Sequence, residues 1–427
     1  MRQFLREIIQ EWHTRELPKI KKREVDIHRY LTPTISKIVS IVGFRRSGKT
    51  YLLFDLAKTL NREDCLYINF EDERIPEDAA ILTELSNILL EFYGDRKITL
   101  ILDEIQNIPN WSKWLRRMLD THRYTIFISG SSSKLSPAEI PTELRGRSLT
   151  VYLFPLSFAE YLEFLNKNIK NLSHGVILNI LREYLIFGGF PEIALVERGK
   201  KYLIIEDYFS TFITRDIFER YNVRQKAAFK EVLRLLLNST YFTINKIANI
   251  LKNAGYNIGK GTLANYIHYL QESLFLYPVE FFSPKAKERI QYPRKAYFID
   301  NFLIYRFTSG ISSNISRLME NTVALELIKK TKKDPTLDIF YWKDYSQHEI
   351  DFVVKEHTNI KELIQVSYVA SEIELNNREI KSLIKGSHVF NTSNLKIITW
   401  DLEKELKVKN KTITLIPLWK WLLQHKL

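Results

Sequence analysis

One short motif limits the fold of this chain more than any other feature. Residues 43–50 read GFRRSGKT and match the pattern G-x-x-x-x-G-K-[ST]. The preceding ISKIVSIV is rich in β-branched residues, as a strand is, and the following TYLLFDLAKTL has the apolar spacing of a helix. A strand, a glycine-containing loop and a helix in this order predict a phosphate-binding loop (P-loop) in an α/β core.

The needs of phosphate binding explain the residue types of this loop. Its two glycines let backbone N–H groups converge on phosphate oxygens, and the N-terminus of the following helix adds partial positive charge. We expect Lys49 to reach the β- and γ-phosphates of ATP or ADP, and the Thr50 hydroxyl to bind Mg²⁺. The expected nucleotide-binding residues are Gly43, Phe44, Arg45, Arg46, Ser47, Gly48, Lys49, Thr50 and Tyr51.

Two arginines inside the loop stand close to a lysine, and like charges repel. We therefore expect Arg45 and Arg46 to lie beside a bound polyphosphate. Contact of one of them with a neighbouring subunit is the alternative.

A second segment, KITLILDEIQNIPNW, supplies carboxylates about 55 residues after the loop. The apolar run 98–102 predicts a buried parallel strand that ends at Asp103 and Glu104. We expect Asp103 to hold Mg²⁺ through water and Glu104 to polarise the attacking water. The competing interpretation is a pair of solvated acids at a strand end.

A third strand, YTIFISG, is followed by serines and, further on, by ELRGRS. Ser131 is our candidate for contact with the γ-phosphate or the lytic water, although serines after a strand also form plain turns. Arg145 and Arg147 are candidate arginine fingers that act on an adjacent subunit. A surface pair of cations is the equal alternative for these two arginines.

These blocks, together with LYINFEDERI, FPLSFAEYL and YLIFGGFPEIAL, resemble the prokaryotic AAA+ family ATPases. More narrowly, they resemble the archaeal and bacterial group whose C-terminal half carries a domain of uncharacterised function related to restriction endonucleases. The resemblance covers nearly the whole chain. It implies a RecA-like αβα core, a small helical lid from about Pro155 to Tyr221, and ATP hydrolysis.

Composition limits the remaining possibilities. A chain of 427 residues exceeds one ordinary core, so we expect two or three domains. The net charge of +13 favours a polyanionic partner such as DNA, with a general bias toward Lys and Arg as the alternative. The single Cys65 fits a reducing compartment, and no run of 18 apolar residues occurs. We therefore expect a cytoplasmic protein without a membrane segment.

Three helical patterns and two strands between residues 225 and 300 predict a winged helix. Its third helix, GKGTLANYIHYLQESLFL, is expected to expose Lys260, Thr262, Asn265 and Tyr266. A basic tip between the strands is expected to track phosphates. The candidate nucleic-acid contacts are Lys260, Lys285, Lys287, Arg289, Arg294 and Lys295. A winged helix that serves only as a packing module is the alternative.

The C-terminal segment has the order of helices and strands of a PD-(D/E)xK nuclease, but it lacks two of the residues that such a nuclease site needs. Glu320 lies on a helix and Asp351 on a strand, as such a metal site requires. Gln365 stands where the second carboxylate belongs, and Ser367 stands where the lysine belongs. We therefore expect a nuclease-like fold with a degenerate site, unless Lys355 or Lys361 takes the role of the lysine.

The sequence thus predicts a multidomain α/β protein with four parts. These are a P-loop ATPase core over 1–154, a lid over 155–224, a winged helix over 225–300 and a PD-(D/E)xK-like domain over 301–427. The predicted function is Mg²⁺-dependent ATP binding and hydrolysis that controls DNA binding or remodelling. A nucleotide-gated scaffold that acts on a protein partner and an ATP-dependent nuclease stay open, as does assembly into a homo-oligomer.

Overall fold

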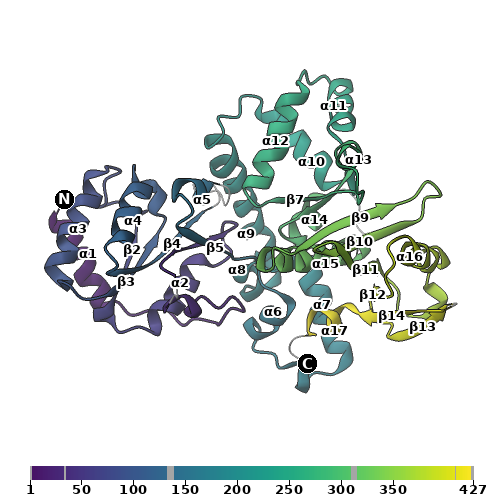
Figure 1. The fold of residues 1–427 in the computed structure, drawn as a ribbon, viewed down its shortest axis with the longest axis horizontal. Helices are drawn as coiled ribbons and strands as arrows, with labels where there is room; N and C mark the ends of the chain where they lie inside the picture. Colours follow the sequence, from purple (N-terminus) through teal and green to yellow (C-terminus); the bar gives the residue numbers. More distant parts are fainter. Residues whose placement is uncertain (1, 33–34, 132–138, 309–314, 409, 425–427) are drawn as a thin grey trace. The chain divides into compact units, whose positions relative to one another are not determined.

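The computed structural model describes residues 2–32, 35–131, 139–308, 315–408 and 410–424 (Figure 1). Its internal packing divides the chain into two compact units, and each is described here by itself. The first unit comprises Met1–Phe154, Tyr208–Asn222 and Glu272–Leu274. The second unit comprises Pro155–Asp207, Val223–Gln271 and Phe275–Leu427.

A five-stranded parallel sheet forms the centre of the first unit. The strands follow the order β2-β3-β4-β1-β5, and every neighbouring pair is parallel. Their bounds are β1 Ile38–Gly43, β2 Cys65–Asn69, β3 Ile98–Asp103, β4 Tyr124–Ser131 and β5 Ser148–Tyr152. All six residues of β1 and of β3 are buried, as expected of central parallel strands. The predicted parallel α/β core of the P-loop type is confirmed.

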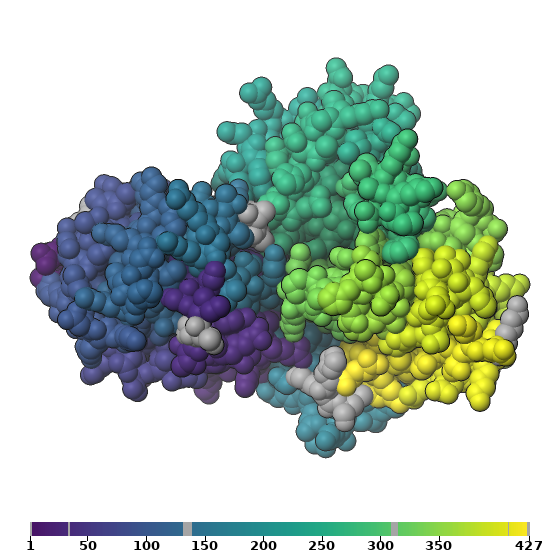
Figure 2. All heavy atoms as spheres, in the orientation of Figure 1, coloured from purple at the N-terminus to yellow at the C-terminus, as the bar shows by residue number. Residues whose placement is uncertain are grey.

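Helices pack against this sheet and complete the core. Helix α2 contacts β1, β3 and β4, α4 contacts β4, and α1 packs on α3 and β2. In the space-filling view the purple-to-blue residues of this region form one continuous body (Figure 2). The helix bounds are α1 Arg2–Thr14, α2 Lys49–Lys58, α3 Ala80–Tyr93, α4 Trp111–Asp120 and α5 Glu139–Glu143. The π-helical segment η5, Phe212–Glu219, also belongs to the first unit.

The second unit begins with short helices. Helix α6 starts at a capping box, in which the Ser157 side chain and the Glu160 side chain bond each other's backbone N–H groups. The bounds are α6 Phe158–Phe164, α7 His174–Phe187, α8 Pro191–Leu195 and α9 Arg198–Thr211, of which α9 runs past the boundary between the units. Between α7 and α8, the Gly189 amide donates to the buried Asp300 carboxylate at 2.7 Å. A Cβ atom on Gly188 would lie 1.7 Å from the same carboxylate, so this position needs glycine.

Helices and a small antiparallel sheet follow. Helix α11 is capped by Thr243, because the Thr243 hydroxyl accepts a hydrogen bond from the Lys246 amide. The helices are α10 Lys226–Leu237, α11 Ile244–Asn253, α12 Lys260–Glu272 and α13 Ala286–Gln291. The sheet has the order β6-β8-β7, with β6 Tyr241–Phe242, β7 Leu276–Val279 and β8 Arg294–Phe298. The expected exposure of Tyr266 is wrong, because this ring is buried and packs on Phe229.

A six-stranded mixed sheet completes the second unit, in the order β13-β14-β12-β11-β10-β9. Helix α15 contacts β8, β9 and β11, and α16 contacts β10 and β11. The strands are β9 Leu337–Lys343, β10 Glu349–Glu356, β11 Asn359–Ser367, β12 Leu395–Thr399, β13 Lys404–Val408 and β14 Lys411–Pro417. The helices are α14 Asn301–Phe307, α15 Ile315–Lys333, α16 Asn377–Val389 and α17 Leu418–Leu422.

Backbone hydrogen bonds tie the two sheets of the second unit together. The Tyr341 amide donates to the Glu280 carbonyl at 3.0 Å, and the Phe282 amide donates to the Tyr341 carbonyl at 2.7 Å. The predicted winged-helix and C-terminal segments are thus parts of one compact unit rather than separately packed bodies. The four-part division of the chain stays a prediction. Among the described residues, no helix is long and apolar enough to cross a membrane.

Candidate nucleotide-binding site

The predicted P-loop connects β1 to α2 at the edge of the parallel sheet where the strands end. Gly48 has φ of 97°, which L side chains rarely adopt, and directly precedes α2. A Cβ atom on Gly43 would lie 2.3 Å from the Leu153 carbonyl oxygen and 2.8 Å from Ser47 Oγ. The local backbone therefore requires both glycines of the motif.

The predicted catalytic lysine lies across this loop. The Lys49 Nζ atom donates to the carbonyl oxygens of Gly43 at 3.0 Å and Phe44 at 3.4 Å. Burial lowers the pKa of Lys49, while Glu104 and Asp103 act in the opposite direction. The ammonium is thus held where a phosphate chain would meet the N-terminus of α2.

Thr50 and Asp103, predicted to share a metal ion, lie in direct contact. The Thr50 hydroxyl donates to the Asp103 carboxylate at 2.7 Å, and the Tyr67 hydroxyl donates to the same oxygen at 3.0 Å. Ser129 Oγ donates to the other oxygen of Asp103. A hydroxyl and a carboxylate are hard oxygen ligands of the kind that Mg²⁺ prefers.

Glu104 follows at the tip of β3 with φ of 54°. A left-handed backbone at a residue other than glycine is uncommon and is found more often near functional sites. Its amide donates to the Ser129 carbonyl at 2.9 Å, and its carboxylate accepts from Gln106. The backbone therefore orients the predicted water-activating carboxylate away from the regular strand.

An unsatisfied hydroxyl tests whether these residues fit a nucleotide. Ser47 Oγ is buried and, among the described atoms, has no hydrogen-bond partner. The Ser47 carbonyl accepts from the buried Arg23 at 2.8 Å, which fixes the loop from behind. An unpaired donor beside a helix N-terminus suits a phosphate oxygen, so the donor set fits a magnesium nucleotide.

The two loop arginines have protein partners that the sequence did not indicate. Arg45 forms a bidentate ion pair with the buried Asp216, with Arg45 Nη2 2.8 Å from Asp216 Oδ1. The Arg46 guanidinium lies 5.3 Å from the centre of the Tyr208 ring. Arg220, one helical turn after Asp216, pairs with Glu139 at 3.1 Å. Asp216 also raises the pKa of Arg45 through their hydrogen bonds.

The remaining predicted residues of this site vary in their surroundings. Phe44 is buried against Phe212, whereas Tyr51 is 54% exposed. Arg147 pairs with Asp120 at 2.9 Å, and Arg145 is exposed with φ of 50°. The backbone of Ser131 pairs with Gly43 at the end of β4, but its side chain lies outside the described part of the structure.

A cluster of buried charges in the second unit corrects one prediction. Lys295 is 1% exposed, so it is not a surface cation of a basic tip. Its Nζ atom lies 2.7 Å from Asp351, 2.9 Å from Glu320 and 3.1 Å from Glu349. Burial acts to lower the pKa of Lys295, but the carboxylates outweigh it and raise the pKa well above its usual value.

Two tyrosines and the backbone complete this charge cluster. The Tyr241 hydroxyl donates to Glu349, and the Tyr297 hydroxyl donates to Glu320 at 2.7 Å. The second oxygen of Asp351 accepts from the Val366 amide at 3.0 Å. The regular pairing of β10 with β9 is interrupted between Ile350 and Val353, next to Asp351.

Three of the four predicted nuclease-like residues come together in this cluster. The Gln365 side chain accepts from the Asp351 amide at 3.3 Å, and Glu320 and Asp351 share Lys295. Ser367 instead bonds Glu379. Among the described residues, no group of three or more His, Cys, Asp or Glu side chains is arranged to hold a metal ion.

The other predicted cations differ in exposure. Lys260, Lys285 and Lys287 are exposed, and Arg289 and Arg294 are half-buried. Lys355 pairs with Asp338 at 3.5 Å and Lys361 pairs with Glu356 at 2.6 Å.

Comparison with known proteins places the chain among relatives of similar length. It is 37% identical over 422 residues to the uncharacterized protein MJ1544 of Methanocaldococcus jannaschii, an alignment that covers 95% of this chain and 92% of the relative. The chain belongs to the family of MJ1544. An uncharacterized protein of Haemophilus influenzae is 27% identical over 91% of this chain and 94% of its own length.

Domain models agree with the P-loop geometry of this MJ1544 family member. Residues 35–162 match the model described as an AAA domain, and residues 178–314 and 316–421 match two domains of unknown function. The Walker-type ATPase PABY2304 of Pyrococcus abyssi is similar with a TM-score of 0.45 and 14% identity, over 68% of this chain and 98% of that chain. The prediction of an AAA-type P-loop domain is confirmed, whereas the winged-helix and restriction-endonuclease-like interpretations stay predictions.

Proposed function

We propose that the chain is an Mg²⁺-dependent AAA+ ATPase whose nucleotide state controls its engagement of DNA. The observation that carries the ATPase part is the 2.7 Å hydrogen bond between Thr50 and Asp103, with Glu104 directly after the end of β3. A metal-binding hydroxyl, a metal-binding carboxylate and a second carboxylate for water meet at one end of a parallel sheet. This is the arrangement that phosphoryl transfer to water needs.

Each residue has a distinct role in this proposal. Lys49 exchanges its loop carbonyls for the β- and γ-phosphates, and Ser47 Oγ gains a phosphate oxygen as its partner. Thr50 and Asp103 would hold Mg²⁺, which when bound would supply positive charge to the phosphates. Glu104 accepts a hydrogen bond from the attacking water and orients it toward the γ-phosphate.

Arg145 is the arginine that we assign to an adjacent subunit's nucleotide. It is exposed at a tight turn of left-handed backbone, whereas Arg147 is paired with Asp120. A finger that acts in trans requires a homo-oligomer, and it would add several orders of magnitude to the hydrolysis rate.

We assign DNA contact to the helices and strands between residues 225 and 300, interpreted as a winged helix. The order α10, β6, α11, α12, β7, α13, β8 supports this interpretation, with the short helix α13 between the two strands of the wing. Lys260, Lys285 and Lys287 are exposed on these elements, and the chain carries a net charge of +13.

We further propose that the PD-(D/E)xK-like domain binds DNA or a partner without cleaving it. Its carboxylates Glu320 and Asp351 are already paired with the buried Lys295, and Ser367 cannot replace the catalytic lysine. An ATP-dependent nuclease is therefore the less supported alternative.

The test measures duplex, single-stranded and branched DNA binding by the full chain with ADP and with a non-hydrolysable ATP analogue. We expect affinity for one DNA form to differ at least several-fold between the two nucleotides, and to fall in the triple variant Lys285→Ala, Lys287→Ala and Arg289→Ala. Equal affinity in both nucleotide states would contradict control of DNA binding. No DNA binding, with ATP turnover intact, would favour the scaffold that acts on a protein.

A further inference from the structure

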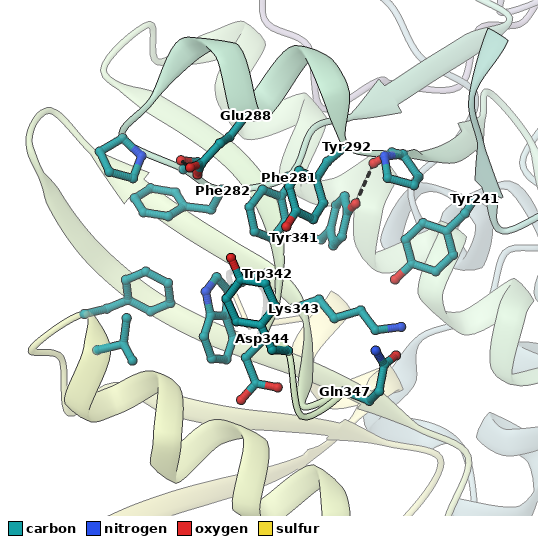
Figure 3. Close-up of a pocket in the computed structure, with 16 residues that line it drawn as sticks. Tyr241, Phe281, Phe282, Glu288, Tyr292, Tyr341, Trp342, Lys343, Asp344 and Gln347 are labelled. Carbon is teal, nitrogen blue, oxygen red and sulfur yellow. Dashed lines mark hydrogen bonds between the residues drawn. The ribbon is translucent and has the colours of Figure 1, made fainter. Parts of the chain in front are cut away.

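We propose that an aromatic cavity in the second unit binds an unpaired base of single-stranded nucleic acid (Figure 3). This inference deepens the proposed DNA role and rests on it. The cavity has a volume of about 790 Å³. It is lined mainly by residues around α13, by residues at the end of β9 and by residues at the C-terminal end of α16. Cavities of roughly 300 to 1,000 Å³ are typical of small-molecule and cofactor sites.

The walls of this cavity are built from flat rings. Eight of its sixteen lining residues are aromatic. Phe281 and Tyr292 are stacked, with ring centres 4.2 Å apart and planes inclined by 13°. Tyr341 meets Phe281 edge to face, as Figure 3 shows beside the stacked pair. Successive rings of this kind form a stacking platform, and every nucleobase offers a face for it.

The mouth of the cavity exposes aromatic surface that folding leaves in water. Tyr345 is 97% exposed and Tyr292 is 36% exposed, although both line the cavity. Leaving a large ring in water forgoes the stabilisation that burial would give. A base that stacks on either ring would cover aromatic surface that water now contacts.

The charges around the cavity favour a nucleic acid over a neutral peptide as its occupant. The two acids of the cavity wall already have cationic partners, Glu288 with Lys285 and Asp344 with Lys385. Lys343 also lines the cavity, is one-third exposed and lies 3.6 Å from Glu349, a carboxylate that also contacts the buried Lys295, and it extends toward Tyr241 in Figure 3. Lys287 is exposed on the adjacent α13. Cations around rings match a phosphate backbone with bases inserted between aromatic side chains.

A single strand fits this cavity better than a duplex. Bases in a duplex are stacked on both faces and cannot present a face to protein rings without being flipped out. An unpaired strand offers its bases without that cost. The cavity therefore distinguishes single-stranded from duplex substrates.

The test is fluorescence anisotropy of a 5′-fluorescein-labelled oligothymidylate of twelve nucleotides with the full chain. We expect Tyr345→Ala and Tyr292→Ala each to weaken binding by about fivefold to 100-fold, the range typical of lost base stacking. Tyr368→Ala, an exposed tyrosine in the same unit but outside the cavity, is the matched control and should leave the affinity unchanged. Lys343→Gln should reduce the slope of the logarithm of the binding constant against the logarithm of the salt concentration by about one.

Two results would overturn the inference. If the wild-type chain bound the oligonucleotide and all three tyrosine variants matched it, the cavity would not be the site, and the proposed DNA role would survive. If instead the chain bound only aromatic peptides and no form of DNA, both the cavity assignment and the DNA role would fail. Thermal unfolding of each tyrosine variant, compared with that of the wild type, reports whether the variant is folded.

Discussion

Arg45 of the P-loop forms an ion pair with Asp216, a residue 171 positions later that is fully buried. The two lie within the first unit, so the loop is anchored to the π-helical segment η5. This pair gives Arg45 a role that does not require a nucleotide. π-Helical segments are rare and are often found at functional sites.

Replacing Asp216 with alanine should destabilise the first unit by about 2 to 4 kcal/mol, because it leaves a largely buried guanidinium without its counterion. Chemical denaturation measures this loss. Asp120→Ala is the matched control, since it breaks the exposed pair with Arg147 and should cost less than about 1 kcal/mol. Equal effects of the two substitutions would show that the Arg45 pair adds nothing special.

Lys295→Met should cost about 3 to 5 kcal/mol at pH 8, because three carboxylates would lose their shared cation. The loss should shrink at pH 5, where the orphaned carboxylates take up protons. Lys361→Met, which breaks an exposed pair with Glu356, controls for loss of charge alone. Thermal and denaturant unfolding at both pH values provide the comparison, and a loss that does not depend on pH would contradict the cluster account.

Asp300 should make stability depend on pH. Burial raises its pKa to about 7, although hydrogen bonds from Gly189 and Phe302 oppose this. The pKa of Asp in an unfolded chain is about 3.9, so the folded state holds a proton that the unfolded state releases between these values. This contribution is therefore present at pH 4 and lost as the pH rises to about 7.

The variant Asp300→Asn isolates that effect, because other titrating groups cancel in the comparison. The free energy of unfolding of the wild type, relative to the variant, should be larger at pH 5 than at pH 8. The same difference at both pH values would mean that Asp300 is ionised throughout.

Removal of Mg²⁺ should weaken nucleotide binding through Thr50 and Asp103. With a fluorescent ATP analogue, we expect the wild-type affinity to fall about tenfold or more when EDTA is added, a change of about 1.4 kcal/mol or more. Asp103→Asn should bind with similar affinity with and without Mg²⁺. If the variant kept the full Mg²⁺ effect, Asp103 would not belong to the metal site.

Much of the nucleotide site was predictable because most of its residues lie close together in the sequence. Gly43, Gly48 and Lys49 lie within one loop, and the contact of Thr50 with Asp103 follows from parallel strands that end at the same edge. The central strands were predictable because buried parallel strands are continuous apolar runs.

The partners of Arg45 and Lys295 were not predictable from the sequence. Asp216 lies far along the chain in a helix whose charged residues also suggest an ordinary surface pair. Lys295 stands in a run of basic residues that is typical of an exposed tip. Its burial becomes apparent only in the structure, where β8 packs against α15 and Lys295 forms an ion pair with Asp351. Long-range charge pairs leave no periodic signal in a single sequence.

The most direct test of the ATPase claim is steady-state hydrolysis of ATP with Mg²⁺ by the wild type and by Glu104→Gln. We predict that the wild type releases phosphate, and that the variant binds ATP with unchanged affinity but hydrolyses it at least about 100-fold more slowly, as expected when a positioned base is lost. Equal turnover by the two proteins would contradict the assignment of the catalytic site to this P-loop and to Glu104.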